Sequence, residues 1–323
     1  IQNEDSVITH EDLIKCLRLT IGSQISPNME LLGIMPTQFI INDTDKVPNP
    51  IGVIGNKLTI KDVITIVPKK NIMPITSCLE KLNIKVVDYL AGPYGDYYEF
   101  KTKETQDSVG AIINIGGSNT IVSIFNKGIL TSSETLPIGG INIDSDIGYV
   151  YKIGRNDAMY LKEKLALAYK EMAQPNESIS LNNKNGDTIK INQYDLSEIC
   201  ESRLEEILNL AKKQINLLTK KEISYIIVTG GVTEFTDFDY LLQDIFNHKA
   251  IIGNVSEIGC RNNSYSTAIG EIKYYNSRLK LKHEEFSILN LDDQEELSGI
   301  HKKVNISDSS LLGKLFSYFF YFL

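Results

Sequence analysis

The N-terminal part of the chain combines one helical pattern with several short strand patterns. Residues 9–17 begin with Thr-His-Glu-Asp and continue with apolar residues at helical spacing, which predicts an N-capped amphipathic helix with acidic residues in its first turn. Pro36, an Asn-Asp pair and a Pro-Asn-Pro-Ile-Gly turn separate apolar runs that predict short strands at residues 31–34, 39–41 and 58–67. These elements predict a small α+β unit that ends near Pro68.

The middle of the chain has the mixed pattern of an α/β protein. Apolar spacing predicts helices at residues 72–82, 157–172, 197–218 and 267–275. Apolar runs predict strands at residues 85–90 and 224–228, and two strands within residues 111–125 that bend around a glycine pair. Asn126-Lys127-Gly128 and Asn185-Gly186 predict hairpin turns.

The end of the chain changes abruptly from polar to apolar. Residues 292–308 are polar and acidic, and the aromatic segment after them predicts a tether followed by a helix. The segment is shorter than the roughly 20 apolar residues of a spanning helix, so we expect it to lie in the interface of an anionic membrane. The alternative is a terminal helix that closes the core, but the polar tether favours the membrane. The predicted membrane contacts are Leu311, Leu312, Lys314, Leu315, Phe316, Phe319 and Phe320.

Composition and charge limit the possible classes of protein. The 323 residues are 42% hydrophobic, which is enough for two domain-sized cores. A net charge of -8 without a basic stripe argues against nucleic-acid binding. Four widely spaced cysteines without a CxxC pair predict buried thiols in a reducing cytosol and no metal site. The chain opens at Ile1 with neither Met nor a signal-peptide pattern, so we expect a truncated or processed chain.

Three glycine pairs, each after an apolar segment, carry the candidate chemistry. A glycine pair at a strand end lets the backbone approach a phosphate, and neighbouring Ser or Thr residues add donors. One such pair is usually an ordinary tight turn, whereas three in order favour phosphate binding. The segments are Asn114-Ile-Gly-Gly-Ser-Asn-Thr120, Pro137-Ile-Gly-Gly-Ile-Asn-Ile-Asp-Ser-Asp146 and Ile226-Ile-Val-Thr-Gly-Gly231.

In this order the segments resemble the second phosphate, connecting and adenosine motifs of the actin, sugar-kinase and heat-shock chaperone superfamily. Within it, residues 138–147, 263–273 and 49–58, and Met35-Pro36 with Phe39, resemble the bacterial cell-division family FtsA. The resemblance runs from about Thr9 to the last residue. It implies an α/β, actin-like (ribonuclease H-like) two-lobed fold with an inserted α+β subdomain 1C, lacking the N-terminal strands of lobe 1A and the first phosphate motif.

The resemblance also implies an order of subdomains. Residues 1–68 would be the SHS2-like subdomain 1C, residues 69–106 the remainder of 1A, and residues 107–156 and 219–262 subdomain 2A. The other segments would be subdomain 2B with adjoining helices (157–218), a C-terminal helix that returns to 1A (263–282), a linker (283–308) and an amphipathic membrane-targeting helix (309–323).

An ATP site between two related halves follows from the same resemblance, with Mg²⁺ as an accompanying ion. The phosphates would contact Gly116, Gly117, Ser118, Asn119 and Thr120, with the connecting glycines Gly139 and Gly140. The nucleoside side would include Lys162, Arg203, Glu206, Thr229, Gly230 and Gly231. For Arg203 and Glu206, an i, i+3 surface ion pair explains the spacing equally well.

Two positions depart from the superfamily pattern. Asn114 stands where Asp is usual, and its amide lacks the charge that orients water around Mg²⁺. Met159 stands where the pattern has Glu. Asp144 is expected at a helix start and Asp146 is a possible cleft residue. No Ser-His or Cys-His arrangement is readable, so we predict no catalytic residue and at most slow ATP hydrolysis.

The resemblance implies an adaptor rather than a metabolic enzyme. Such a protein binds ATP, polymerises with itself on the cytoplasmic face of the membrane at the division site, and links the C-terminal tail of FtsZ to lipid. The FtsZ tail would dock within residues 157–218. The alternatives are a pilus-assembly adaptor of the PilM type, which does not need a lipid helix, and a phosphotransferase or ATPase of the same superfamily.

Overall fold

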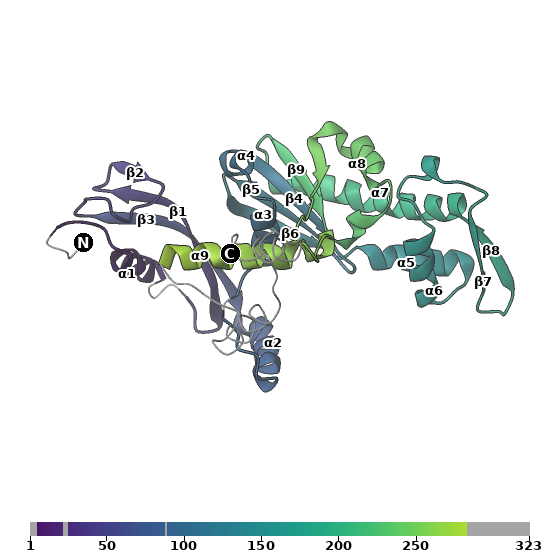
Figure 1. Cartoon of the computed structure of the whole chain (residues 1–323), viewed down its shortest axis with the longest axis horizontal. Helices are drawn as coiled ribbons and strands as arrows, with labels where there is room; N and C mark the ends of the chain where they lie inside the picture. Colours follow the sequence, from purple (N-terminus) through teal and green to yellow (C-terminus); the bar gives the residue numbers. More distant parts are fainter. Residues whose placement is uncertain (1–4, 22–24, 88, 283–323) are drawn as a thin grey trace, which may run out of the picture. The chain divides into compact units, whose positions relative to one another are not determined.

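The computed structural model (Figure 1) describes residues 5–21, 25–87 and 89–282, and the described residues up to Ser277 form one compact unit. The first helix, α1 (His10–Ile21), is capped as predicted: the Thr9 amide donates to Asp12 Oδ2 at 3.1 Å, and Thr9 Oγ1 accepts from the Asp12 amide at 3.3 Å. This reciprocal pair satisfies donors that the helix itself leaves open. The predicted N-cap is therefore confirmed.

A three-stranded antiparallel sheet packs with α1. Its order is β2-β1-β3, from β1 (Met29–Ile41), β2 (Asp45–Val47) and β3 (Leu58–Pro68). The prediction that Pro36 separates two strands is wrong, because β1 runs through it. Pro36 lies beside a register shift in the β1–β3 pairing. Strand β2 pairs only with residues 39–41, so the missing amide of Pro36 removes no hydrogen bond between β1 and β2.

Three helices follow this sheet: α2 (Lys69–Lys81), α3 (Gly92–Glu99) and α4 (Lys103–Asp107). The helix predicted at residues 72–82 is confirmed, with an earlier start. The strand predicted at residues 85–90 is wrong, since the described residues there form no strand. A strand is stable only beside a hydrogen-bonded neighbour, and the described part of the chain pairs none with this segment.

The central sheet has five strands in the order β10-β9-β4-β5-β6. It contains β4 (Val109–Ile115), β5 (Thr120–Asn126), β6 (Ile129–Leu136), β9 (Tyr225–Thr229) and β10 (Ala250–Ile252). Strand β4 is parallel to β9, which is parallel to β10, whereas β5 and β6 continue antiparallel. The hairpin between β5 and β6 turns where the sequence predicts, with positive φ at Lys127 and Gly128.

Five longer helices surround or follow this sheet: α5 (Gly140–Tyr151), α6 (Arg155–Lys164), α7 (Gln193–Leu218), α8 (Phe238–Phe246) and α9 (Ser266–Lys282). The helix predicted at residues 157–172 ends at Lys164, and a short 3₁₀ turn, η2 (Lys170–Met172), follows. The chain turns between them because Leu165 is buried and the Leu167 amide donates to Ser197 Oγ of α7. The predicted hairpin is present as β7 (Ser178–Asn182) and β8 (Thr188–Asn192), with Gly186 at positive φ.

Alternate residues of the central strands enter two different cores. Ala111 and Ile113 of β4 pack in the large core with helices α5 to α8. Ile112 faces the other way, into a smaller core with α3, where the rings of Tyr97 and Phe125 stack at a centroid distance of 4.6 Å. Both faces of the sheet are therefore covered, which explains why β4 and β5 read as nearly continuous apolar runs.

The cysteines differ from the expectation that all four are buried. Cys200 in α7 is buried, and burial raises the pKa of its thiol to about 12. Cys16 and Cys260 are half-buried, and Cys78 is exposed. The cause for Cys78 is that α2 contributes no buried residue to either core.

The predicted linker (283–308) and membrane-targeting helix (309–323) lie outside the described residues. Among the helices that the structure describes, none is both long and apolar enough to cross a bilayer.

Candidate functional site

The first two glycine pairs meet backbone to backbone. The turn between β4 and β5 holds Gly116 and Gly117, whose carbonyl oxygens accept hydrogen bonds from the amides of Gly140 and Ile141 at 3.0 and 2.8 Å. A Cβ at Gly139 would lie 2.5 Å from the Gly116 oxygen. Only glycine at residue 139 therefore allows the start of α5 to approach the turn this closely.

The third glycine pair lies at the end of the neighbouring strand. Thr229, the last residue of β9, is paired in register with Asn114 of β4. Gly230 follows with φ of +96°, and a Cβ there would lie 2.6 Å from Asn114 Oδ1. Parallel strands that end together form the edge at which α/β proteins commonly bind ligands. All three glycine segments are therefore at one edge of the sheet.

A cavity of about 460 Å³, here called the glycine cavity, opens at this edge. Four of the predicted site residues line it: Gly117, Gly140, Lys162 and Gly231. Apart from Asp144 and Met159, which the sequence analysis discusses, the rest of its wall was not identified from the sequence. Most of it lies on α6 and around the turn η3 (Gly231–Glu234), which meet only in the folded chain. The additional lining residues are Ile141, Asp144, Arg155, Met159, Glu163, Ala166, Val232, Glu234, Phe235 and Thr236.

An ion pair between α5 and α6 forms one wall of the glycine cavity. Lys162 Nζ lies 2.6 Å from Asp144 Oδ1 and also donates to the Gly140 carbonyl oxygen at 3.4 Å. Both side chains are largely buried, at 15% and 4% exposure. Asp144 is thus not the helix-start residue that the sequence suggests. That role belongs to Asn142, whose Oδ1 accepts from the Gly139 amide at 2.9 Å.

Several predicted residues support the glycine turns rather than line the cavity. Thr120 is fully buried, and its hydroxyl donates its hydrogen bond to the Ile138 carbonyl oxygen at 2.8 Å rather than to a ligand. Thr229 is also fully buried. Ser118 and Asn119 are exposed at the tip of the turn, and the Asn119 carbonyl oxygen accepts from the Gly116 amide at 2.9 Å.

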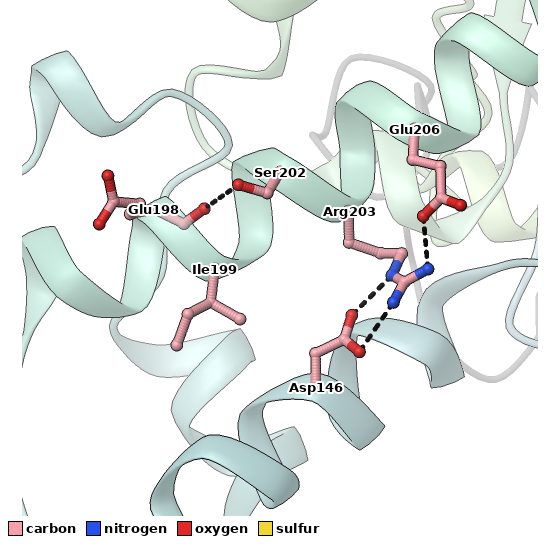
Figure 2. Close-up of a pocket in the computed structure, with 6 residues that line it drawn as sticks. All are labelled: Asp146, Glu198, Ile199, Ser202, Arg203 and Glu206. Carbon is pink, nitrogen blue, oxygen red and sulfur yellow. Dashed lines mark hydrogen bonds and ion pairs between the residues drawn. The ribbon is translucent and has the colours of Figure 1, made fainter.

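Arg203 and Glu206 lie in a different cavity, of about 360 Å³, here called the Arg203 cavity. Figure 2 shows the guanidinium between two carboxylates: Nε and Nη2 lie 2.6 and 2.8 Å from the oxygens of Asp146, and Nη1 lies 2.5 Å from Glu206 Oε2. The hydrogen bonds with Asp146 are the main reason that the pKa of Arg203 is raised. The ion-pair interpretation of the Arg203 and Glu206 spacing is therefore present in the structure. The other lining residues are Glu198, Ile199 and Ser202.

Asn114 faces a buried carboxylate that the sequence analysis missed. Its Nδ2 donates to both oxygens of Asp96 at 3.0 and 2.9 Å and to Thr267 Oγ1 at 3.0 Å. Burial raises the pKa of Asp96, and hydrogen bonds from Thr267, Asn114 and Ser266 oppose this effect. No local pattern in the sequence points to Asp96, because α3 is a short helix that also carries Glu99.

The glycine cavity contains groups that can bind an anion together with three carboxylates, of which Asp144 is paired with Lys162 and Glu234 accepts from the Asn263 amide. Exposed backbone of the first glycine turn, the Lys162 ammonium and the exposed Arg155 side chain surround one space. In the described ranges, no group of three or more His, Cys, Asp or Glu residues is arranged to hold a metal ion. The arrangement is suited to binding and orienting a phosphorylated ligand.

Comparisons with known proteins match two parts of the chain to one family. The family model of the cell division protein FtsA matches residues 111–270, and the model of the SHS2 domain inserted in FtsA matches residues 1–66. The FtsA of Bacillus subtilis is 25% identical over 280 residues, covering 85% of this chain. The FtsA of Escherichia coli K12 is 22% identical over 282 residues, covering 83%. The chain spans 63% of the length of the Bacillus relative and 67% of the Escherichia one.

Solved structures support the actin-like α/β fold. MreB5 of Spiroplasma citri, solved with ADP, matches with a TM-score of 0.56 at 17% identity, over 66% of this chain and 67% of that one. The PilM-PilN type IV pilus biogenesis complex matches with a TM-score of 0.50 at 12% identity, over 81% and 72%. The SHS2 model covers the N-terminal sheet up to residue 66, and the FtsA model covers the three glycine segments. The chain therefore belongs to the FtsA family of cell division proteins.

Proposed function

We propose that this chain is an ATP-binding adaptor of cell division that polymerises on the membrane and tethers FtsZ to it. The observation that carries the proposal is the glycine cavity, in which backbone from three glycine segments and a lysine converge at one sheet edge. Family membership supports the cell-division role. ATP, FtsZ and lipid are the ligand and partners that this role requires.

The residues of the glycine cavity divide into a phosphate side and a nucleoside side. Gly117 and Gly140 present backbone without a Cβ. Lys162, which the resemblance places on the nucleoside side, lies beside Gly140 in the structure and supplies a positive charge there. The nucleoside side is formed by Gly231, Val232, Glu234, Phe235 and Thr236, and Glu163 offers a carboxylate to ribose hydroxyls. Met159 adds an apolar surface where the superfamily pattern has an acid.

Mg²⁺ fits this site as a companion of the phosphates rather than as an ion held by a protein cage. Asp144 is paired with Lys162, and the Asn114 amide is hydrogen-bonded to Asp96, so neither is a free carboxylate. Mg²⁺ commonly keeps several waters and binds through substrate phosphates. The same two observations support slow hydrolysis, since neither residue offers a charge to orient an attacking water. ATP then acts mainly as a conformational ligand.

ATP binding is tested by titrating the intact chain with a fluorescent ATP analogue in the presence of Mg²⁺. A saturable signal that unlabelled ATP competes away is expected, because the cavity provides both phosphate and nucleoside contacts. Inorganic phosphate should compete only weakly, since it uses one half of the cavity. A signal that does not saturate, or that unlabelled ATP leaves unchanged, would contradict the proposal.

Membrane attachment rests on the sequence of residues 309–323, where apolar and aromatic residues recur at helical spacing after a polar tether. The intact chain should co-sediment with vesicles that contain phosphatidylglycerol, and a chain shortened from Ser310 onward should stay in the supernatant. Binding by one such helix is weak and reversible, so polymerisation would strengthen it by avidity. Equal sedimentation of both chains would remove lipid from the proposed function.

A further inference from the structure

A buried carboxylate lies directly behind the end of β4, where the glycine cavity begins. Asp96 on α3 is only 2% exposed. It accepts hydrogen bonds from Asn114 of β4, from Ser266 Oγ at 3.2 Å and from Thr267 Oγ1 at 2.6 Å, the last two at the start of α9. Three elements that are far apart in sequence therefore meet at one side chain, and all three of these donors are neutral.

This carboxylate determines which way the Asn114 amide points. With Nδ2 toward Asp96, the amide donates to both carboxylate oxygens and to Thr267. The reversed amide would place its oxygen against two negatively charged oxygens, which is unfavourable. Asn114 Oδ1 is therefore held on the opposite side, where it lies against Gly230.

The contact continues into the glycine cavity. Gly230 adopts a φ of +96°, and the space that a Cβ would need there is occupied by Asn114 Oδ1 and the Ile115 carbonyl group. The next residue, Gly231, lines the cavity itself. Asp96 is thus connected to the cavity wall through one side chain and one turn.

Asp96 also sits on a rigid support. A Cβ at Gly270 of α9 would overlap the Gly95 carbonyl oxygen, so the backbones of α3 and α9 are in direct contact. A Cβ at Gly95 would in turn clash with the Thr267 carbonyl oxygen, at 2.5 Å. The backbone that carries Asp96 is therefore held tightly against α9, as a positioning group requires.

We propose that Asp96 is a positioning residue of the glycine cavity: it orients Asn114, and through Asn114 it holds the Gly230–Gly231 turn in the shape that binds nucleotide. The affinity part of this inference rests on the proposed ATP function, whereas the orientation of Asn114 does not. Asp96 itself contacts no ligand. The interaction needs a carboxylate at one of the two positions and an amide at the other, so that one side chain accepts the hydrogen bonds that the other donates.

The test exchanges the two groups. Asp96→Asn places a donor where three donors converge, and Asn114→Asp places two carboxylates face to face. Each single variant should weaken binding of the fluorescent ATP analogue about tenfold, as expected for loss of hydrogen bonds to a charged group. The double variant Asp96→Asn/Asn114→Asp restores one carboxylate and one amide, so its affinity should return to within about threefold of the original chain.

Affinity is measured well below the unfolding midpoint of every variant, so that only folded protein is compared. If the midpoints fall but the affinity stays within about twofold, Asp96 is merely structural and the proposal is overturned. A double variant that binds no better than the weaker single variant overturns it as well. Binding by Asp96→Leu at the original affinity would have the same meaning.

A second readout does not depend on ATP. In the intact chain the side-chain amide protons of Asn114, identified in NMR spectra by their loss in Asn114→Asp, should exchange slowly with solvent. In Asp96→Asn they should exchange about tenfold faster, together with the backbone amides of the Gly230 turn. If the chain binds no ATP, this readout alone decides: unchanged exchange overturns the inference, and faster exchange supports it while the proposed function fails.

Discussion

The glycine cavity and the Arg203 cavity share one helix but are built in different ways. Asp144 and Asp146 are two residues apart on α5, and residues at that spacing point to nearly opposite sides of a helix. Asp144 therefore pairs with Lys162 in the glycine cavity, and Asp146 pairs with Arg203 in the other. The two ion pairs look alike in sequence but differ in their access to water.

The two ion pairs differ in solvent exposure, and this difference sets how much stability is lost when one partner is removed. The Lys162 and Asp144 side chains are 15% and 4% exposed, whereas Arg203 and Asp146 are 27% and 28% exposed. A charge left alone in a buried position is costly, while one near water is rehydrated. The walls differ as well, because three glycines are among the residues that line the glycine cavity and none lines the Arg203 cavity.

The largest effect is expected when Lys162 is replaced. Lys162→Met leaves Asp144 buried without its partner, so the free energy of unfolding should fall by about 3–5 kcal/mol, measured by urea denaturation. Affinity for the ATP analogue should fall as well, because the positive charge beside Gly140 is lost. Adding Asp144→Asn should recover part of the stability but none of the affinity.

Arg203→Met is the matched control in the second cavity. Asp146 and Glu206 can rehydrate, so the loss of stability should be about 1 kcal/mol or less. A loss as large as that of Lys162→Met would contradict the contrast in burial. An equal drop in ATP affinity in both variants would instead join the two cavities into one ligand site, as the family resemblance of Arg203 and Glu206 implies.

An effect on stability between those of Lys162→Met and Arg203→Met is expected at the glycine backbone. Gly139→Ala inserts a methyl group between backbone atoms of the first glycine turn, so the free energy of unfolding should fall by about 1–3 kcal/mol, measured by urea denaturation. Gly117→Ala is the matched variant: a Cβ there meets only the Ile141 side chain at 3.8 Å, in ordinary contact.

Gly117→Ala should therefore keep its stability within about 0.5 kcal/mol while weakening ATP binding, because the new methyl group lies on the cavity wall. This variant therefore separates the effect of the turn on stability from its effect on ATP affinity. If it binds the ATP analogue as tightly as the original chain, the phosphates do not approach Gly117 and the phosphate side of the site is misplaced.

Local patterns predicted much of the fold. The Thr9 cap, the turn at Lys127-Gly128 and the hairpin at Gly186 depend on residues that are neighbours in sequence, and all three are present. The predictions that failed depend on distant partners. Residues 85–90 have strand propensity, but no described strand pairs with them. Strand β1 tolerates Pro36 because β2 pairs only with residues 39–41, so the missing amide of Pro36 removes no hydrogen bond to β2.

The candidate site divides in the same way. Glycine pairs after apolar strands were recognisable because their conformational freedom is a local property, and the structure brings all three together. Arg203 and Glu206 were placed with them by family resemblance, but both residues lie on α7, where Arg203 pairs with Asp146 of α5 and lines a separate cavity. Glu163, Arg155 and Asp96 gave no local signal, since each acquires its role from elements elsewhere in the chain.

The sequence by itself determined the family, the order of strands and helices around the glycine segments, and the apolar pattern of residues 309–323. Only the tertiary structure decided which charges are paired, which threonines are buried, and that Asn114 is opposed by Asp96. The physical reason is the distance along the sequence over which each kind of interaction acts. Backbone preferences and hydrophobic periodicity act over a few residues, whereas the partner of a buried charge is set by packing between segments as distant as Asp96 and Thr267.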